Sequence, residues 1–549
     1  MSTTNERDPF SLGRHDIKEW PRRLLHVLHM RSYERVGENI YGGVREPVYN
    51  ILSYIWGRWQ MPTSSGQFLN IDGISWSVPS IRPEIFTPTE FQSALKQVSV
   101  GVDWLWVDVA CIDQEDEKIR DEEIGRQAGI FNNAKEAFIW LHHSPIHKLQ
   151  RFFDLLFEIS EKVDEIDDDI WSDDTWKNAL REILEVLDED PWFSSLWTLQ
   201  EAYLRSEATL LSKEGLRPQR EGYSRVGLAS VLVAFGNIDY VIKYSTRSES
   251  SDIQSPSWLR DRDEISRRID KLGLAVGDNP VLLYSSAGFR QTGPTNQTDR
   301  IYGIMQVFGF RLGKSVIPGA HFSLSQLEIQ FAAALNEKSA VWAQLFVHTK
   351  PQPAGQHWCI SQSSRLPESL TLAAIAPRSL CKIALDDKQR AHFTGQACSF
   401  GDLKRGWENA RGRMSLRNFW GMEINGMALI EVIALDRCEF TLISVPAHLL
   451  EIKNELSDEN QKLGNLLKPY NDELRVFLLG KIYQVVDVEE SDEDEEERVG
   501  DLELSAGMLV RRIERNHGTA WQRLGVTVWA DIGDEDDAVH WYETRSMLD

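Results

Sequence analysis

The stretch VDWLWVDVACIDQED, residues 102–116, changes character along its length. Large apolar residues come first, and carboxylates with one amide follow. A short apolar run predicts a strand that is buried on both faces of a sheet. Open α/β sheets bind ligands beyond the carboxyl ends of their strands. We therefore expect Asp108, Asp113 and Gln114 to lie at a ligand-binding edge.

Similar apolar runs stand on either side of this stretch. They are VYNILSYIWG at 48–57 and EAFIWL at 136–141. A helix is predicted at 87–98, with Thr89 as its N-cap. An amphipathic segment follows residue 116, so strands alternate with helices. This alternation predicts a parallel sheet with helices on its faces.

The end of the first predicted strand adds to the expected edge. Ser53 and Trp56 would lie beside the polar residues of the second strand, because parallel strands end on one side of a sheet. The run 207–212 predicts one more strand. Two amphipathic helices between 145 and 189 are interpreted as an insertion packed on the sheet.

The length of 549 residues predicts about two to four domains. We divide the chain by changes in its sequence pattern. The expected parts are an N-terminal extension (1–47), an α/β domain (48–212), a mainly helical region (213–330), and a mixed or mainly β C-terminal region (331–549) with an acidic loop at 487–497.

Composition excludes several classes of function. The net charge of −24 argues against binding to nucleic acid or to an anionic membrane. Five cysteines without a CxxC pair favour a reducing compartment and argue against a zinc ribbon. The N-terminus is polar, and no run of about 18 apolar residues occurs. We expect a cytoplasmic protein with no membrane span.

Three apparent motifs do not support a site. The stretch GFRLGKS at 309–315 has three residues between its glycines, whereas a phosphate-binding P-loop has four. The pairs His26/His29 and His142/His143 lack a companion ligand at metal-binding spacing, so no metal is expected. Cys111 has no histidine nearby in sequence and is interpreted as a small buried residue.

The stretch WTLQE, residues 197–201, leaves two interpretations open. In a helix, Trp197 and Glu201 share one face. In a first helical turn, Glu201 would complement the helix dipole or cap the helix. Alternatively, Glu201 is a reactive carboxylate beside an aromatic side chain.

Together these segments closely resemble the fungal heterokaryon incompatibility (HET) domain. Its first motif, LSYxWG, is present at Leu52, Ser53, Tyr54, Trp56 and Gly57. Its second motif is present at Trp106, Asp108, Cys111, Ile112, Asp113 and Gln114. The third, W-x-x-R-x-W-x-x-Q-E, is matched at 192–201 except that serine replaces the arginine. The segments 298–309 and 521–529 are similar to later parts of the family pattern.

The resemblance implies a fold and an activity. The HET domain looks like TIR domains, which have a flavodoxin-like parallel sheet, and many of those hydrolyse NAD. Their catalytic glutamate lies in a W-x-L-x-E pattern, which corresponds to Glu201 here. NAD would be a substrate, with no resident cofactor. The substrate-binding residues implied are Ser53, Tyr54, Trp56, Gly57, Asp108, Asp113, Gln114 and Trp197.

The family also implies a biological role, which is nonself recognition that leads to programmed cell death. Two mechanisms stay open at this point. The chain is an effector that consumes NAD, or it is a non-catalytic, TIR-like module that acts by self-association or through protein partners. The predicted architecture is α/β, with a TIR-like parallel sheet and helical insertion, then a helical segment and a mixed α+β C-terminal region.

Overall fold

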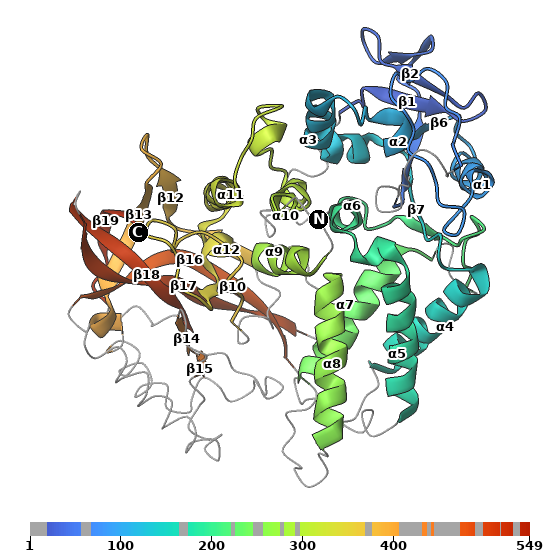
Figure 1. The fold of residues 1–549 in the computed structure, drawn as a ribbon. Helices are drawn as coiled ribbons and strands as arrows, with labels where there is room; N and C mark the ends of the chain where they lie inside the picture. The colour runs from blue at the N-terminus through green and yellow to red at the C-terminus, as the bar shows by residue number, and fades with distance from the viewer. Residues whose placement is uncertain are drawn as a thin grey trace. The chain divides into compact units, whose positions relative to one another are not determined.

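The computed structural model describes most of the chain in fifteen stretches (Figure 1). They are residues 19–55, 67–163, 174–220, 226–244, 256–274, 279–290, 297–367, 376–403, 405, 431–435, 441–443, 473–488, 498–515, 518–530 and 539–549. The chain forms two compact units. One, called the N-terminal unit here, comprises residues 10–278 and 286–327; the other, the C-terminal unit, comprises 1–9, 279–285 and 328–549.

A sheet with six described strands organises the N-terminal unit, in the order β2-β1-β6-β5-β7-β8. Figure 1 labels its strands β1, β2, β6 and β7. The strands are β1 (Arg23–His26), β2 (Arg31–Glu34), β5 (Tyr49–Ser53), β6 (Trp104–Trp106), β7 (Ala137–Trp140) and β8 (Thr209–Leu211). Strands β6, β5, β7 and β8 are parallel to one another. In chain order these four stand second, first, third and fourth, which is the flavodoxin-like arrangement. The predicted α/β class is confirmed.

Within the predicted extension 1–47, the described residues contribute two strands to this sheet. Strand β1 pairs antiparallel with β6, with Leu25 opposite Leu105, and β2 pairs with β1. Leu24 and Leu25 are fully buried. These strands cover the edge that β6 would otherwise leave open.

The predicted first helix is present as α1 (Pro88–Val98), but its N-cap is Thr87 and not Thr89. The Thr87 side chain accepts from the backbone N–H of Glu90, whose carboxylate accepts from the backbone N–H of Thr87. Proline at the first helical position has a backbone angle that already suits a helix. Together with this capping box it fixes the start two residues earlier.

Helices cover the sheet, and alternate residues of β7 show how. Ala137 and Ile139 belong to one apolar cluster, together with residues of α4 (Ile146–Val163) and α5 (Asp174–Glu189). Phe138 and Trp140 belong to a second cluster that contains residues of α1. A strand buried on both faces is what a continuous apolar run predicts.

The helical region after residue 212 does not begin a separate compact unit. Buried residues of α7 (Leu228–Tyr244) and α8 (Pro256–Leu272) join the cluster that contains α4 and α5. The other helical segments in or adjoining this unit are α2 (Asp108–Cys111), α3 (Glu117–Asn133), η3 (Pro191–Ser194), α6 (Leu196–Leu204), α9 (Pro280–Phe289), α10 (Asp299–Tyr302), η5 (Met305–Phe308), η6 (Gly313–Ser315) and α11 (Leu324–Lys338). A small hairpin joins β3 (Ile40–Tyr41) to β4 (Val44–Arg45).

The C-terminal unit contains an antiparallel sheet with nine described strands. They are β11 (Ala376–Ser379), β12 (Lys382–Leu385), β13 (Ala391–Ser399), β14 (Glu431–Leu435), β15 (Thr441–Ile443), β16 (Leu474–Val488), β17 (Arg498–Arg515), β18 (Gly518–Ala530) and β19 (Tyr542–Met547). The unit also holds α12 (Ala340–Gln344) and the pair β9 (Val347–His348) and β10 (Ser364–Arg365). The mixed α+β prediction is confirmed. The acidic loop 487–497 begins inside β16, and its residues 489–497 lie outside the described stretches.

Among the described helices, none combines the length and the apolar character needed to cross a membrane.

Candidate functional site

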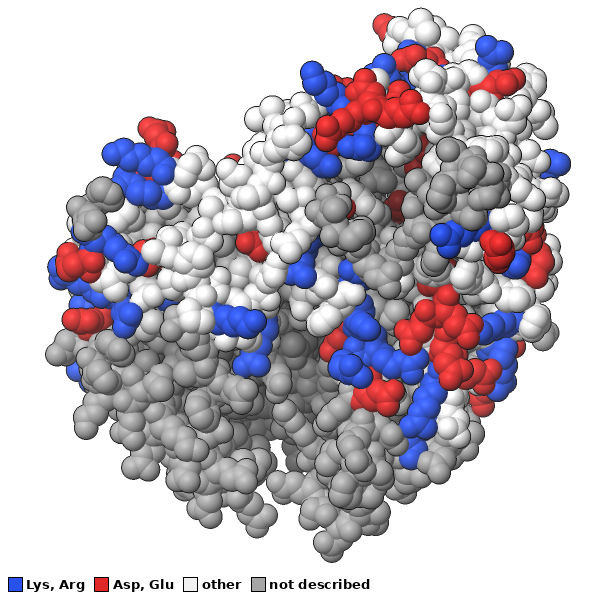
Figure 2. Space-filling view, viewed as in Figure 1, with Lys and Arg blue, Asp and Glu red and all other residues white. Residues whose placement is uncertain are grey.

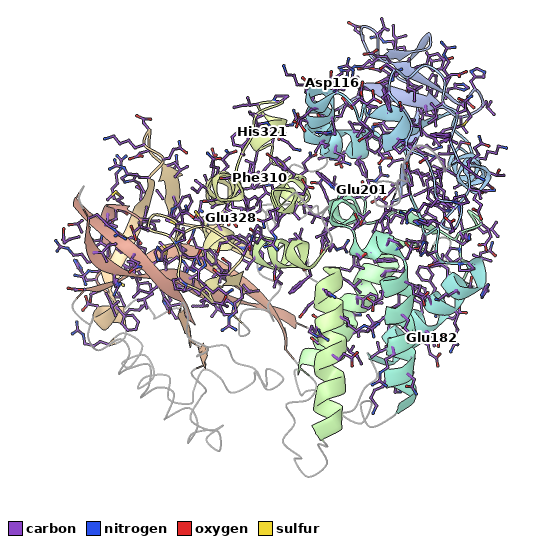
Figure 3. All side chains as sticks on the ribbon, in the orientation of Figure 1. Asp116, Glu182, Glu201, Phe310, His321 and Glu328 are labelled. Carbon is purple, nitrogen blue, oxygen red and sulfur yellow. The ribbon has the colours of Figure 1, made fainter. Side chains whose placement is uncertain are left out.

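The carboxylate of Glu201 is the centre of the candidate site, and it comes from α6 (Figure 3). Glu201 is the sixth residue of that helix, and its backbone carbonyl accepts from the N–H of Arg205 at the C-cap. The interpretation of Glu201 as a first-turn residue that caps the helix is therefore wrong. A carboxylate near the end of a helix gains nothing from the helix dipole.

One oxygen of Glu201 accepts a hydrogen bond from a serine, which in turn accepts one from a tryptophan. The hydroxyl of Ser53, the last residue of β5, donates to Oε2 of Glu201. The indole Nε1–H of Trp192 donates in turn to Oγ of Ser53 at 2.7 Å. The indole N–H can only donate, so it leaves the serine hydroxyl to point its own hydrogen at the carboxylate.

Trp192 is itself fixed by a buried carboxyl. Oδ1 of Asp190 accepts from the backbone N–H of Trp192 at 3.1 Å, and Oδ2 accepts from the N–H of His143 at 3.2 Å. Burial raises the pKa of Asp190 to about 7. The turn that carries Trp192 is thus tied to the segment that follows β7.

The second oxygen of Glu201 faces an amide. Nε2 of Gln127, on α3, donates to Oε1 of Glu201 at 3.5 Å. Nε2 of Gln200 donates to Oε1 of Gln127 at 2.9 Å. Both glutamine side chains are buried, whereas Glu201 is partly exposed. The carboxyl group is therefore held from two sides, in a residue that as a whole is partly exposed.

A second carboxyl lies close enough to influence the first. Asp108 is the first residue of α2, separated from the end of β6 by one residue, and it lies beside the Tyr54 side chain. Burial raises the pKa of Glu201 to about 8, the hydrogen bond from Ser53 opposes the rise, and the charge of Asp108 adds to it. Burial also raises the pKa of Asp108. The two carboxyls disfavour each other's ionisation.

Four of the predicted site residues therefore lie together at one end of the parallel strands. Ser53 ends β5 and Tyr54 follows it, Asp108 lies just beyond β6, and Glu201 reaches the same place from α6. Strand β5 is the point where the parallel strand order reverses, between β6 and β7. Such a switch point is where open α/β sheets bind ligands.

Asp113 and Gln114 are not at a strand end, and this part of the prediction is wrong. Strand β6 stops at Trp106, and the single turn of α2 intervenes. Oδ1 of Asp113 accepts from the N–H groups of Glu115 and Asp116, and Nε2 of Gln114 donates to the carbonyl of Ile112. Both side chains thus make local contacts that shape the entry to α3.

The structure describes only some of the remaining predicted residues. Trp197 lies one turn before Glu201 on α6 and is partly exposed, so the two share a face as expected. Trp56 and Gly57 lie outside the described residues. Cys111 is buried, and burial raises its pKa to about 12, which disfavours the reactive thiolate.

Sequence reasoning missed the residues that hold Glu201. Trp192 belongs to the third family motif, yet nothing in the motif says that its indole reaches β5. Gln127 and Gln200 were not singled out either. The available signal was polar side chains at helical positions that prove to be buried, and recognising it requires the burial pattern.

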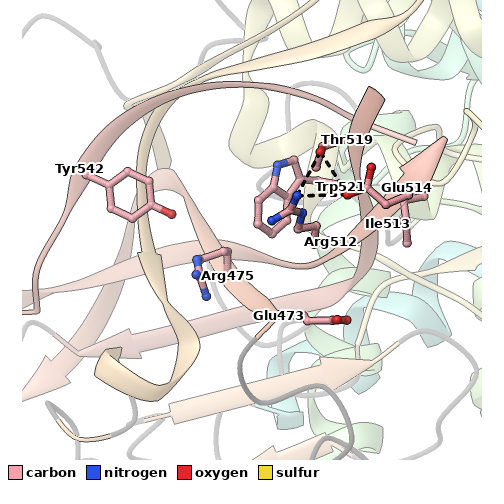
Figure 4. A pocket seen from close by; sticks show the side chains of 8 residues that line it. All are labelled: Glu473, Arg475, Arg512, Ile513, Glu514, Thr519, Trp521 and Tyr542. Atoms are coloured by element: carbon pink, nitrogen blue, oxygen red, sulfur yellow. Dashed lines mark hydrogen bonds and ion pairs between the residues drawn. The ribbon is translucent and has the colours of Figure 1, made fainter. Parts of the chain in front are cut away.

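No other described region forms a comparable site. In the described ranges, no three or more His, Cys, Asp or Glu side chains are grouped so that they could hold a metal ion. An open pocket of about 590 Å³ lies on the C-terminal sheet (Figure 4). There, Arg512 is already paired with Glu514 at 3.1 Å, and Arg475 donates to the carbonyl of Leu474. Two of the charged side chains that line this pocket, Arg512 and Glu514, therefore pair with each other.

Comparison with known proteins gives one result. Residues 49–201 match the sequence pattern of the family described as "Heterokaryon incompatibility protein (HET)". A search of curated proteins and a search of solved structures each found no match. The matched range includes β5, β6 and β7, and it ends at Glu201.

Proposed function

We propose that this heterokaryon incompatibility (HET) domain protein hydrolyses NAD to nicotinamide and ADP-ribose, with Glu201 as the catalytic carboxylate. The HET domain supports a function of the incompatibility type. Loss of the NAD pool would be the step that connects nonself recognition to programmed cell death. The same proposal places the protein in the cytoplasm. A protein partner or self-association would trigger its activity.

The observation that carries the proposal is the position of the carboxylate. Glu201 lies at the switch point of the parallel sheet, partly exposed, with donors on both oxygens. A carboxylate already held in place stabilises charge in a transition state without having to reorganise. This suits a reaction in which positive charge develops on the substrate.

NAD hydrolysis is such a reaction. The bond between C1′ of the ribose and the nicotinamide nitrogen breaks, and its electron pair leaves with neutral nicotinamide. Because that leaving group is neutral, it needs no protonation, unlike the leaving group of an ordinary glycoside. The ribosyl centre becomes oxocarbenium-like, and an ionised Glu201 would stabilise it. Water then bonds to C1′ and releases a proton.

When Glu201 is ionised, the charge of the site fits this substrate at the reacting end. Asp108 and Glu201 contribute two carboxyls, and the nicotinamide ring of NAD is cationic. On the face drawn in Figure 2, acidic and basic side chains are interspersed, and no broad basic patch appears among the described residues. Together with the net charge of −24, this argues against nucleic acid as a substrate.

The test is nicotinamide release from NAD by the full chain and by Glu201→Gln. The matched control is Glu182→Gln, because Glu182 is an exposed carboxylate on α5 that pairs with Arg151 (Figure 3). We expect release by wild type and by the control, and loss of it in Glu201→Gln. The assay covers a series of protein concentrations, since association could be required. A rate of nicotinamide release in Glu201→Gln equal to that of wild type would show that Glu201 is not the catalytic carboxylate.

A non-catalytic module is the second candidate, and one observation favours it. With its pKa raised to about 8, Glu201 is mostly neutral at pH 7. A neutral carboxyl stabilises a cation poorly. Under this alternative, light scattering shows self-association or partner capture while no nicotinamide is released at any pH. A chain that stays monomeric with and without candidate partners would exclude it.

A further inference from the structure

Gln306 makes an unusual contact with α3. The residue lies in η5, outside the family match. Its side-chain Oε1 accepts from the backbone N–H of Ala128 at 2.5 Å, and its Nε2 donates to the carbonyl of Ile124. In an α-helix these two backbone groups normally bond to each other, because they are four residues apart. The Gln306 side chain thus binds both backbone groups of one i, i+4 pair of α3.

The same residue begins a row of hydrogen bonds that ends at Glu201. The backbone N–H of Gln306 donates to Oε1 of Gln200 at 3.4 Å. Nε2 of Gln200 donates to Oε1 of Gln127 at 2.9 Å, and Nε2 of Gln127 donates to Oε1 of Glu201 at 3.5 Å. The three glutamines are 2%, 0% and 6% exposed, respectively.

All donors in this row point the same way, toward the carboxylate. A glutamine amide has one accepting and one donating end. Because Gln200 occupies the oxygen of Gln127, the NH₂ group of Gln127 is the end that faces Glu201. If the two ends of the Gln127 side-chain amide were exchanged, its carbonyl oxygen would face the carboxylate of Glu201. Aligned hydrogen bonds in a buried row also strengthen one another.

We propose that Gln306 is a positioning residue for Glu201, acting through Gln200 and Gln127. Its side chain anchors the 298–309 segment to α3, and its backbone N–H fixes the direction of the amide row. The segment after the HET domain would then complete the domain's site. This inference rests on the proposed function for its effect on turnover, and on the geometry alone for its effect on the carboxylate.

The test uses Gln306→Leu in the full chain. Leucine has a similar size and removes the side-chain bonds to Ile124 and Ala128, whose backbone groups are normal partners of each other in a helix. The matched control is Gln326→Leu, at an exposed glutamine whose contacts are with Ser323. The first readout is the titration of the Glu201 carboxyl by carbon NMR, identified by difference from Glu201→Gln. The second is kcat and KM for nicotinamide release against pH.

Without its anchor on α3, the 298–309 segment should hold the amide row less firmly, and the weakened donor to Glu201 should raise the pKa of that carboxyl, because a donor favours the charged form. We expect an upward shift on the order of half a pH unit and a fall in kcat of about tenfold from misplacement, with KM nearly unchanged. Gln127→Leu, which removes the last donor, should reproduce the shift. The double variant Gln127→Leu/Gln306→Leu should then show no further shift, since both act along one row.

A titration of Glu201 that is unchanged in both single variants would overturn the inference, as would additive shifts in the double variant. If Gln306→Leu does not fold, Gln306→Met and Gln127→Leu provide the same comparison. The titration separates this inference from the proposed function. Absence of nicotinamide release in wild type would refute the enzyme, while a shifted titration would still support the positioning role.

Discussion

At the scale of single residues, the behaviour of the site depends on how easily Glu201 loses its proton. Three influences act on the pKa of that carboxyl: burial raises it, the Ser53 hydroxyl lowers it, and the charge of Asp108 raises it. The two neighbours therefore work in opposite directions. Removing each one separately should move the pH dependence of activity in opposite directions.

We expect Ser53→Ala to move the acidic limb of nicotinamide release to higher pH, because a donor to the charged carboxylate is lost. Asp108→Asn should move the same limb to lower pH, because a repelling charge is lost. The measurement is kcat against pH between 5.5 and 9.5, with the two variants compared to wild type. Shifts in a common direction would contradict the electrostatic account.

The raised pKa of Glu201 also predicts how folding stability changes with pH. Between the ordinary value of 4.5 and the folded value of about 8, the folded state holds a proton that the unfolded state has released. Stability must then fall as pH rises through this window. In Glu201→Gln this pH dependence is absent. Between pH 4.5 and pH 8.5, the free energy of unfolding of the variant should therefore rise relative to that of wild type by on the order of a few kcal/mol.

Urea unfolding at pH 4.5 and at pH 8.5 checks this expectation. The control is Glu182→Gln, whose carboxylate is exposed. A Glu201→Gln difference from wild type that is the same at both pH values would mean that the carboxyl titrates normally in the folded protein.

At the scale of elements, α1 shows how a local signal stabilises the sheet domain. The capping box between Thr87 and Glu90 satisfies backbone donors at the helix start. Thr87→Ala should reduce the free energy of unfolding by about 1 kcal/mol. Ser99→Ala, at the other end of α1, removes only an exposed hydroxyl that donates to the carbonyl of Lys96 and is the control. Thermal unfolding measures both, and equal effects would contradict the role of the cap.

Several elements were predictable because their signals are local. The apolar runs at 48–57 and 136–141 gave the central strands, and their carboxyl ends gave the correct edge for Ser53. The run at 102–112 was misleading. Its second half, Asp108–Cys111, is a single helical turn with the same apolar character as a strand. Periodicity cannot separate the two over so few residues.

The support of Glu201 was not predictable for a different reason. The contacts of Gln127 and Gln306 join residues far apart in sequence, with separations of 74 for Gln127–Glu201 and 106 for Gln306–Gln200. No local pattern specifies such a pairing. The N-terminal strands were missed similarly, since β1 finds its partner β6 about 80 residues later. Family resemblance supplied Glu201, whereas only the fold supplied its support by Gln127, Gln200 and Gln306.

At the scale of the whole molecule, a bound substrate should stabilise the folded chain. A ligand that binds only the folded state adds about 2.7 kcal/mol at a hundred times its Kd. We expect NAD to raise the Tm of Glu201→Gln progressively with concentration, because that variant binds without consuming it. ADP-ribose, which lacks the cationic ring, should raise the Tm less. No change with NAD up to millimolar concentration would contradict binding at this site.

The central claim is that the ionised form of Glu201 hydrolyses NAD, and the pH profile of nicotinamide release tests it most directly. With saturating NAD, the wild-type rate should rise with pH and level off above about pH 8, following the raised pKa of Glu201. Glu201→Gln should show no release across the same range. A wild-type rate that is flat or falls over this range, or turnover that persists in Glu201→Gln, would contradict the account.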